Sequence, residues 1–281
     1  MFKRQTVGSV VCPSCGSLVG IRDERCFNCG RWNPGLWGFA PLVRRLGNDL
    51  GFVPIVIAGC TALYLITLLL SGPAALGARG VFSILSPTTQ VLFLFGASGG
   101  VPVFGLGRWW TILSAGWLHG GLLHILFNVL WVRQLAPAVA DMYGAGRMVL
   151  IYTIAGACGF LLSSFAGTVP GLHGADITIG ASASIFGLLG ALVYYGRRGA
   201  SGALTSQALS YAIILFVFGL VMRGVDNYAH AGGFAGGYLV SAWLNPLRPE
   251  RQEHLIAALG CLALVVISVL VSVITGVQYL R

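Results

Sequence analysis

The sequence is poor in charged residues. Of its 281 residues, 9% are charged and only eight are Asp or Glu, whereas 56% are hydrophobic. Soluble domains carry about 25% charged residues, so the composition excludes an ordinary soluble globular protein. Apolar runs of about 20 residues recur along the chain, and they predict membrane-spanning helices rather than the short alternating segments of a β-barrel.

The chain also lacks a basic face. Its formal net charge is +9, but the Lys and Arg residues are scattered between the apolar runs, without an aromatic stacking platform. Positive loops are what membrane topology requires, so we predict that the protein does not bind nucleic acid. Because the N-terminus lacks the apolar run of a signal peptide, we also expect no cleavable signal.

Seven apolar segments are predicted to be transmembrane helices, and the region 71–119, which three prolines interrupt, is predicted to be an extended loop. With the N-terminus inside, twelve of the 17 Lys and Arg residues fall in inner segments and four in outer segments. This bias predicts a cytoplasmic N-terminus and places the starts of the second, fourth and sixth spans at the outer side. The spans are residues 52–70, 120–141, 147–166, 180–196, 206–222, 227–245 and 255–277.

Four of the seven cysteines form two C-x2-C pairs near the N-terminus, ten residues apart and each followed by glycine. This spacing is typical of a tetrahedral zinc site, and a cytoplasmic location favours thiolates over disulfides. No general base accompanies the cysteines, so we predict a structural zinc rather than a catalytic one. The predicted ligands are Cys12, Cys15, Cys26 and Cys29.

Two spans begin with residues that can carry chemistry. An ionisable side chain inside a span is costly and is by default functional, and His230 lies near the start of the sixth span. Ser182 lies near the start of the fourth span, at a similar predicted depth, so the two suggest a nucleophile and its general base. His124 and Asn128 share one face of the second span and are uncharged donors that could stabilise an oxyanion.

These residues resemble the motifs of the rhomboid family of intramembrane serine proteases. The resemblance covers roughly residues 105–245. The matching motifs are H-x4-H-x3-N at 119–128, G-x-S-x at 180–183 and Asn-x-Ala-His-x-x-Gly-x-x-x-Gly at 227–237.

The resemblance implies a catalytic dyad and an oxyanion hole. Ser182 would be the nucleophile and His230 its general base. His124, Asn128 and the backbone amide of Ser182 would stabilise the oxyanion. The activity implied is an intramembrane serine endopeptidase that forms an acyl-enzyme and cleaves transmembrane or juxtamembrane segments of membrane proteins.

The resemblance also implies residues that support the dyad. Phe186, one turn after Ser182, would pack against the ring of His230, and Gly233 and Gly237 would let the sixth helix approach the fourth. Substrate would enter laterally, near the fifth span, and the active site would open to the outer face.

The expected fold is an all-α polytopic membrane protein with seven spans. Residues 1–34 would form a cytosolic zinc-ribbon-like module and 35–51 a juxtamembrane linker. Residues 52–245 would form a rhomboid-like six-helix core, and 246–281 an extra C-terminal transmembrane helix. The expected partners are the lipid bilayer and membrane-protein substrates with transmembrane segments, and the ribbon could also bind a cytosolic partner.

Two other functions are left open. A catalytically silent rhomboid relative that binds membrane clients is the first alternative, because Thr111 after Trp110 and Ala140 at the end of the second span depart from the family pattern. A transporter or channel is the second, although the chain shows no convincing internal repeat.

Two residues that a motif search would select are not expected in the dyad. Ser98 lies in a literal G-x-S-x-G, but that segment lacks the strand and helix that flank a nucleophile elbow. Asp226 is expected to cap the sixth helix, since acidic residues favour the first turn. His119 could belong to the site or be an ordinary polar residue at the membrane interface.

Overall fold

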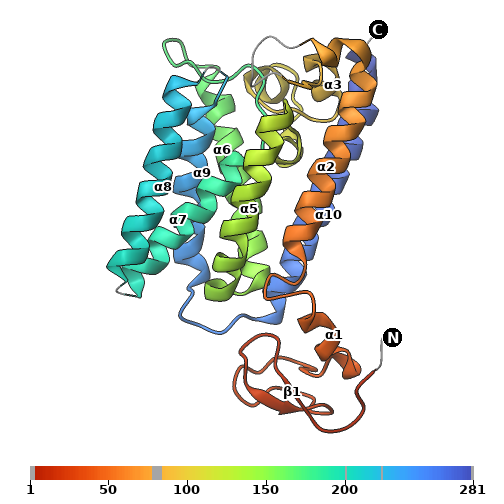
Figure 1. Cartoon of the computed structure of the whole chain (residues 1–281), viewed down its shortest axis with the longest axis vertical. Helices are drawn as coiled ribbons and strands as arrows, with labels where there is room; N and C mark the ends of the chain where they lie inside the picture. The colour runs from red at the N-terminus through yellow and green to blue at the C-terminus, as the bar shows by residue number, and fades with distance from the viewer. Residues whose placement is uncertain (1–3, 78–83, 200, 223, 280–281) are drawn as a thin grey trace.

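The protein is a bundle of helices with a small module at the N-terminal end (Figure 1). This is a computed structural model, and it describes residues 4–77, 84–199, 201–222 and 224–279. The predicted all-helical membrane fold with a small cysteine-bearing module is confirmed.

The N-terminal module is built on a two-stranded hairpin. Strand β1 (Ser9–Val11) pairs antiparallel with β2 (Leu18–Gly20), and η1 (Leu36–Gly38) and α1 (Ala40–Arg44) follow. Units of this size usually need a metal or disulfides in addition to apolar packing. The core of the module is Val10, Cys12, Val19, Ile21, Cys26 and Ala40.

In the described part of the chain, seven long helices form the bundle, and α7 contacts four of the others. Helix α7 packs against α5, α6, α8 and α9, whereas α2 packs on α5 and α10 on α6. The helices are α2 (Phe52–Ser71), α5 (Leu122–Tyr143), α6 (Ala145–Ala166), α7 (Ser182–Arg198), α8 (Gly202–Val221), α9 (Asn227–Leu244) and α10 (Gln252–Gly276).

Five helical segments in the described part of the chain are long and apolar enough to cross a membrane. They include α5, α6 and α8, together with Phe52–Leu76 and Gln252–Tyr279. The prediction of a multi-pass membrane protein is therefore confirmed. Helix α7 has 17 residues and α9 is rich in glycine; neither is among the five, so the count of seven spans stays a prediction.

Helices α7 and α9 approach each other so closely that glycine is needed between them. A Cβ atom at Gly233 would overlap the carbonyl of Ala183, and one at Gly237 would overlap the carbonyl of Gly187. Small residues allow such backbone contact in membrane proteins. The contact fixes the start of α7 against the start of α9.

The region 71–119, predicted as an extended loop, contains several short helical segments where it is described. Its conformation depends on contacts with α10: Arg108 donates to the Ser272 carbonyl at 2.8 Å, and Trp110 Nε1 donates to Ser272 Oγ at 3.0 Å. The sequence shows the prolines but not these distant partners. The segments are η2 (Gly72–Leu76), α3 (Thr89–Leu94), η4 (Val101–Gly105), α4 (Thr111–Ser114) and η5 (Ala115–Trp117).

At the opposite end of the bundle, Arg147 joins α6 to the end of α9. Its side chain is 2% exposed and donates to the carbonyls of Leu244, Asn245 and Arg248 at 2.8–3.0 Å. Its backbone amide donates to Glu250 at 2.9 Å. These bonds satisfy carbonyls that the end of a helix leaves without partners.

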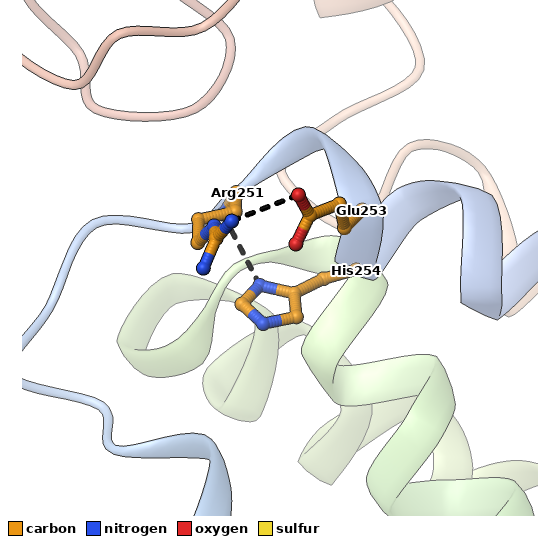
Figure 2. Close-up of polar contacts among 3 residues, drawn as sticks. All are labelled: Arg251, Glu253 and His254. Carbon is orange, nitrogen blue, oxygen red and sulfur yellow. Dashed lines mark hydrogen bonds and ion pairs between the residues drawn. The ribbon is translucent and has the colours of Figure 1, made fainter.

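Polar side chains also gather at the start of α10. Figure 2 shows Arg251 paired with Glu253 at 2.8 Å, and the Arg251 backbone amide donates to His254 Nδ1 at 3.1 Å. The Arg251 and Glu253 side chains are 67% and 70% exposed. Exposed ion pairs contribute about 0–1 kcal/mol, so this contact only weakly fixes the start of the helix.

Candidate active site

Ser182 is the first residue of α7 and follows a turn that requires glycine. Gly180 has φ +119°, and a Cβ atom there would collide with the ring of His124. Both the backbone angle and the nearby ring therefore exclude other residues at position 180. The turn brings the start of α7 against α5.

His230 lies in the first turn of α9 and faces Ser182. Its Nε2 atom is 3.0 Å from Ser182 Oγ, and the residue is 5% exposed. The ring of Phe186 stacks on the imidazole, with centroids 4.2 Å apart and planes at 15°. Phe186 is one turn after Ser182 on the same face of α7, so α7 supplies both the hydroxyl and the support for the ring.

Asn227 is the partner of the other nitrogen of His230, a role that its place in the sequence motif does not predict. Its Oδ1 atom is 3.0 Å from His230 Nδ1, and its Nδ2 atom donates to the Phe216 carbonyl of α8 at 3.2 Å. The sequence signal was the three-residue spacing at the start of a helix, which places both side chains on one face.

His124 and Asn128 lie on α5 near the turn before Ser182. His124 Nδ1 accepts from the Gly120 amide at 3.3 Å, so the neutral ring carries its proton on Nε2, the atom that faces Gly180. Asn128 donates one N–H to the His124 carbonyl at 2.8 Å and keeps a second. Both side chains can therefore still donate.

His119 is buried beside His124, with 1% exposure and ring centroids 5.2 Å apart in an edge contact. Neither of its nitrogens makes a hydrogen bond of good geometry with a described residue, and the Trp117 backbone is its polar neighbour. A buried polar group of this kind calls for an ordered water or a bound group.

The two residues that a motif search would select have other partners. Ser98 pairs through its backbone with Thr178, at 3.0 and 2.7 Å, within the loops. Asp226 accepts from the Ala229 amide at 3.0 Å and from the Ser163 hydroxyl, so it caps α9, as expected. The structure does not bring either side chain to His230 Nδ1.

The four N-terminal cysteines converge, and their sulfur atoms all lie within 4.8 Å of one another. Cys12 and Cys29 are 3.7 Å apart, and Cys15 and Cys26 are 3.6 Å apart. A tetrahedron of sulfurs with zinc–sulfur bonds of about 2.3 Å has edges of about 3.8 Å. The cluster can therefore hold a metal ion of that size.

Electrostatics in the cluster favour a thiolate at Cys15. Burial opposes ionisation, but hydrogen bonds from Ser17 and the neighbouring thiols lower the pKa of Cys15 to about 6. Burial raises the pKa of Cys12 and Cys29. A metal ion bound by the four cysteines would displace the protons of their thiols, because zinc binds thiolates.

The fold and this site define a polytopic helical membrane protein in which a serine and a histidine from two adjacent helices face each other. Residues 106–246 match the model of the rhomboid domain. The chain belongs to the rhomboid family.

Relatives occur in bacteria and plants. The chain is 34% identical over 185 residues to rhomboid protease GluP of Bacillus subtilis (strain 168), covering 64% of this chain and 35% of that one. It is 30% identical over 185 residues to RHOMBOID-like protein 4 of Arabidopsis thaliana, covering 61% of this chain and 45% of that one. The match thus spans less than half the length of either relative.

Proposed function

We propose that this protein is an intramembrane serine endopeptidase with the dyad Ser182 and His230. The observation that carries the proposal is the 3.0 Å separation of Ser182 Oγ and His230 Nε2 in a site buried among helices. Nucleophile and base at this distance are what covalent catalysis requires. The names of relatives such as rhomboid protease GluP support the same activity.

The chemistry proceeds in two halves. Ser182 Oγ attacks the scissile carbonyl carbon while His230 Nε2 takes its proton, and the tetrahedral intermediate collapses as His230 returns that proton to the leaving amine. Water then attacks the acyl-enzyme, His230 takes a proton from it, and the acid product leaves as Ser182 regains its hydrogen.

The oxyanion of each intermediate needs preorganised donors. The amide of Ser182 is available because the first N–H groups of a helix have no intrahelical partner. His124 Nε2–H faces the same turn, and Asn128 retains a free N–H. These three groups are the proposed oxyanion hole.

Substrates are proposed to be membrane proteins with a transmembrane or juxtamembrane segment that reaches the site beside α8. Only three residues of α8 are buried, which leaves most of its surface toward lipid. The excess of Lys and Arg in the predicted inner segments supports a cytoplasmic N-terminus, with the site opening to the outer face.

The test is labelling of the purified protein with a fluorophosphonate probe. Wild type should be labelled, and Ser182→Ala and His230→Ala should not be, while both variants keep their helical content and thermal unfolding. Labelling that survives in Ser182→Ala would exclude this serine as the nucleophile. A folded wild type that never reacts would favour a silent relative that binds membrane clients.

For the N-terminal module we propose a structural zinc at Cys12, Cys15, Cys26 and Cys29. The convergent sulfurs and their separations support this assignment. Metal analysis should find about one zinc per chain, as four thiolates imply, and a Cys26→Ser variant should lose it. Intact protein that contains no metal would refute the assignment.

A further inference from the structure

Asn227 connects the imidazole of His230 to the backbone of α8. Its amide oxygen lies 3.0 Å from His230 Nδ1, and its amide nitrogen lies 3.2 Å from the Phe216 carbonyl. The amide is half-buried at the start of α9. One side chain therefore touches the ring that faces Ser182 and a helix that carries none of the dyad.

The orientation of this amide is determined by α8. A carbonyl oxygen can only accept, so the group that faces the Phe216 carbonyl must be the NH2 of Asn227. If the amide flipped, two oxygens would face each other and the amide nitrogen would face His230. The backbone of α8 thereby leaves Oδ1 as the atom that meets the imidazole.

The amide orientation in turn determines which nitrogen of His230 carries the proton. Oδ1 is an acceptor only, so the hydrogen bond requires a proton on Nδ1. A neutral imidazole then has a free lone pair on Nε2, the atom 3.0 Å from Ser182 Oγ. This is the tautomer that can accept the serine proton.

No carboxylate of a described residue is hydrogen-bonded to Nδ1. The ionisable groups that influence His230 are Asp226 and His124. Asp226 is occupied by the Ala229 amide and the Ser163 hydroxyl, and His124 lies on α5. A neutral amide therefore occupies the place that aspartate holds in Ser-His-Asp enzymes.

We propose that Asn227 is a positioning residue that fixes the tautomer of His230 and makes it depend on the position of α8. This inference rests on the dyad proposed above and adds a third group to it. If α8 moves away, the amide loses the carbonyl that orients it. The base is then competent only while α8 is packed against the start of α9.

Gly219 provides room for this arrangement. It lies on α8, and a Cβ atom there would collide with Asn227 Oδ1. Gly219→Ala should therefore displace the Asn227 amide from the α8 side, while every residue that touches His230 keeps its identity. Alanine also suits a helix better than glycine.

The test compares fluorophosphonate labelling rates as a function of pH. Asn227→Ala should slow labelling roughly tenfold to a hundredfold, less than the ~10⁴-fold lost when a charged orienting aspartate is replaced. Gly219→Ala should slow it in the same direction. Gln207→Ala removes an exposed amide on α8 that donates to the Tyr211 hydroxyl at 3.2 Å, and this variant should label at the wild-type rate.

Asn227→Asp separates positioning from a structural role. Aspartate keeps the acceptor for His230 Nδ1 but loses the donor to Phe216. If Asn227 acts on the tautomer, Asp should restore most of the rate, with the midpoint of the pH profile raised by about one unit because a carboxylate favours the imidazolium. If Asn227 only links α9 to α8 through its hydrogen bond to Phe216, Asn227→Asp should be labelled as slowly as Asn227→Ala.

Thermal unfolding of each variant in detergent identifies any that fail to fold, and Gly219→Ala provides the test if Asn227→Ala is one of them. A folded Asn227→Ala with the wild-type rate and pH profile would overturn this inference alone, as would Asn227→Asp no faster than Asn227→Ala. Wild type without Ser182-dependent labelling would overturn the proposed function as well.

Discussion

Helices α7 and α8 are neighbours in the bundle but differ in how many of their residues are buried inside the protein. Twelve of the 17 residues of α7 are buried, against three of the 20 residues of α8. Helix α8 is apolar enough to cross a membrane and α7 is not among the helices that qualify. The helix that carries the proposed nucleophile is thus surrounded by protein, and its surface need not match lipid.

Glycine allows close contact between the backbones of α7 and α9, whereas the close contact of Gly219 on α8 is with the Asn227 side chain. Gly233 and Gly237 of α9 lie against the backbone of α7, whereas a Cβ atom at Gly202 of α8 would meet nothing. Close backbone contact holds Ser182 and His230 in register, and the described contacts of α8 do not include such a backbone contact with α9. Under the proposed function, this difference leaves the side of α8 for substrate to approach.

The largest effect should come from breaking the contact between α7 and α9. In Gly237→Ala the new methyl group would collide with the backbone of Gly187, which cannot move as a side chain would. Overpacking costs about 1–3 kcal/mol and occasionally more, and we expect the upper end. Thermal unfolding should shift to lower temperature and Ser182-dependent labelling should fall; unchanged values for both would show that the helices can separate at little cost.

A second comparison uses one truncation on each helix. Ile185 of α7 is 2% exposed and Ile214 of α8 is 63% exposed. Ile185→Ala should destabilise by about 2 kcal/mol, because it leaves a cavity among packed side chains. Ile214→Ala should change stability by less than about 0.5 kcal/mol. Equal losses in unfolding experiments would mean that α8 is packed as tightly as α7.

The hydropathy of the sequence predicts the helices that face lipid, whereas the site could be predicted only from motifs and predicted depth. The run 52–70 corresponds to α2 (Phe52–Ser71), because hydropathy reports contact with lipid. The positions of Ser182 and His230 came from motifs and predicted depth. The role of Asn227 was missed because its second partner is the backbone carbonyl of Phe216. Every residue type has this carbonyl, so the sequence does not indicate that the oxygen lies near Asn227.

The short helices of 71–119 illustrate the same limit. Their prolines and glycines are visible in the sequence, but their conformation depends on bonds from Arg108 and Trp110 to Ser272, more than 150 residues away. Local signals predict where regular helices stop. They do not predict which distant carbonyl completes an irregular segment.

A third prediction concerns the ring that α7 places under His230. Phe186→Leu keeps apolar volume but loses the parallel stacking at 4.2 Å. Stacked rings contribute about 0.5–1.5 kcal/mol beyond area burial, so unfolding should shift by about that amount. Labelling should slow severalfold because the imidazole gains freedom. Phe186→Tyr, which preserves the stacking face, is the control, and labelling of Phe186→Leu at the wild-type rate would contradict a positioning role.

The smallest effect should come from the glycine of α8 that touches nothing. Gly202 is exposed in the first turn of α8 and has open space where a Cβ atom would lie. Replacing it with alanine removes conformational freedom from the unfolded chain, so stability should rise by about 0.5 kcal/mol. Thermal unfolding of Gly202→Ala, measured together with wild type and Gly237→Ala, checks this expectation. Labelling of Gly202→Ala is expected at the wild-type rate. The added methyl group would then raise stability at Gly202 of α8 and lower it at Gly237 of α9. A loss of stability in Gly202→Ala would instead mean that the start of α8 has a packing partner, and the contrast between α8 and the α7–α9 pair would be weaker than the glycine contacts imply.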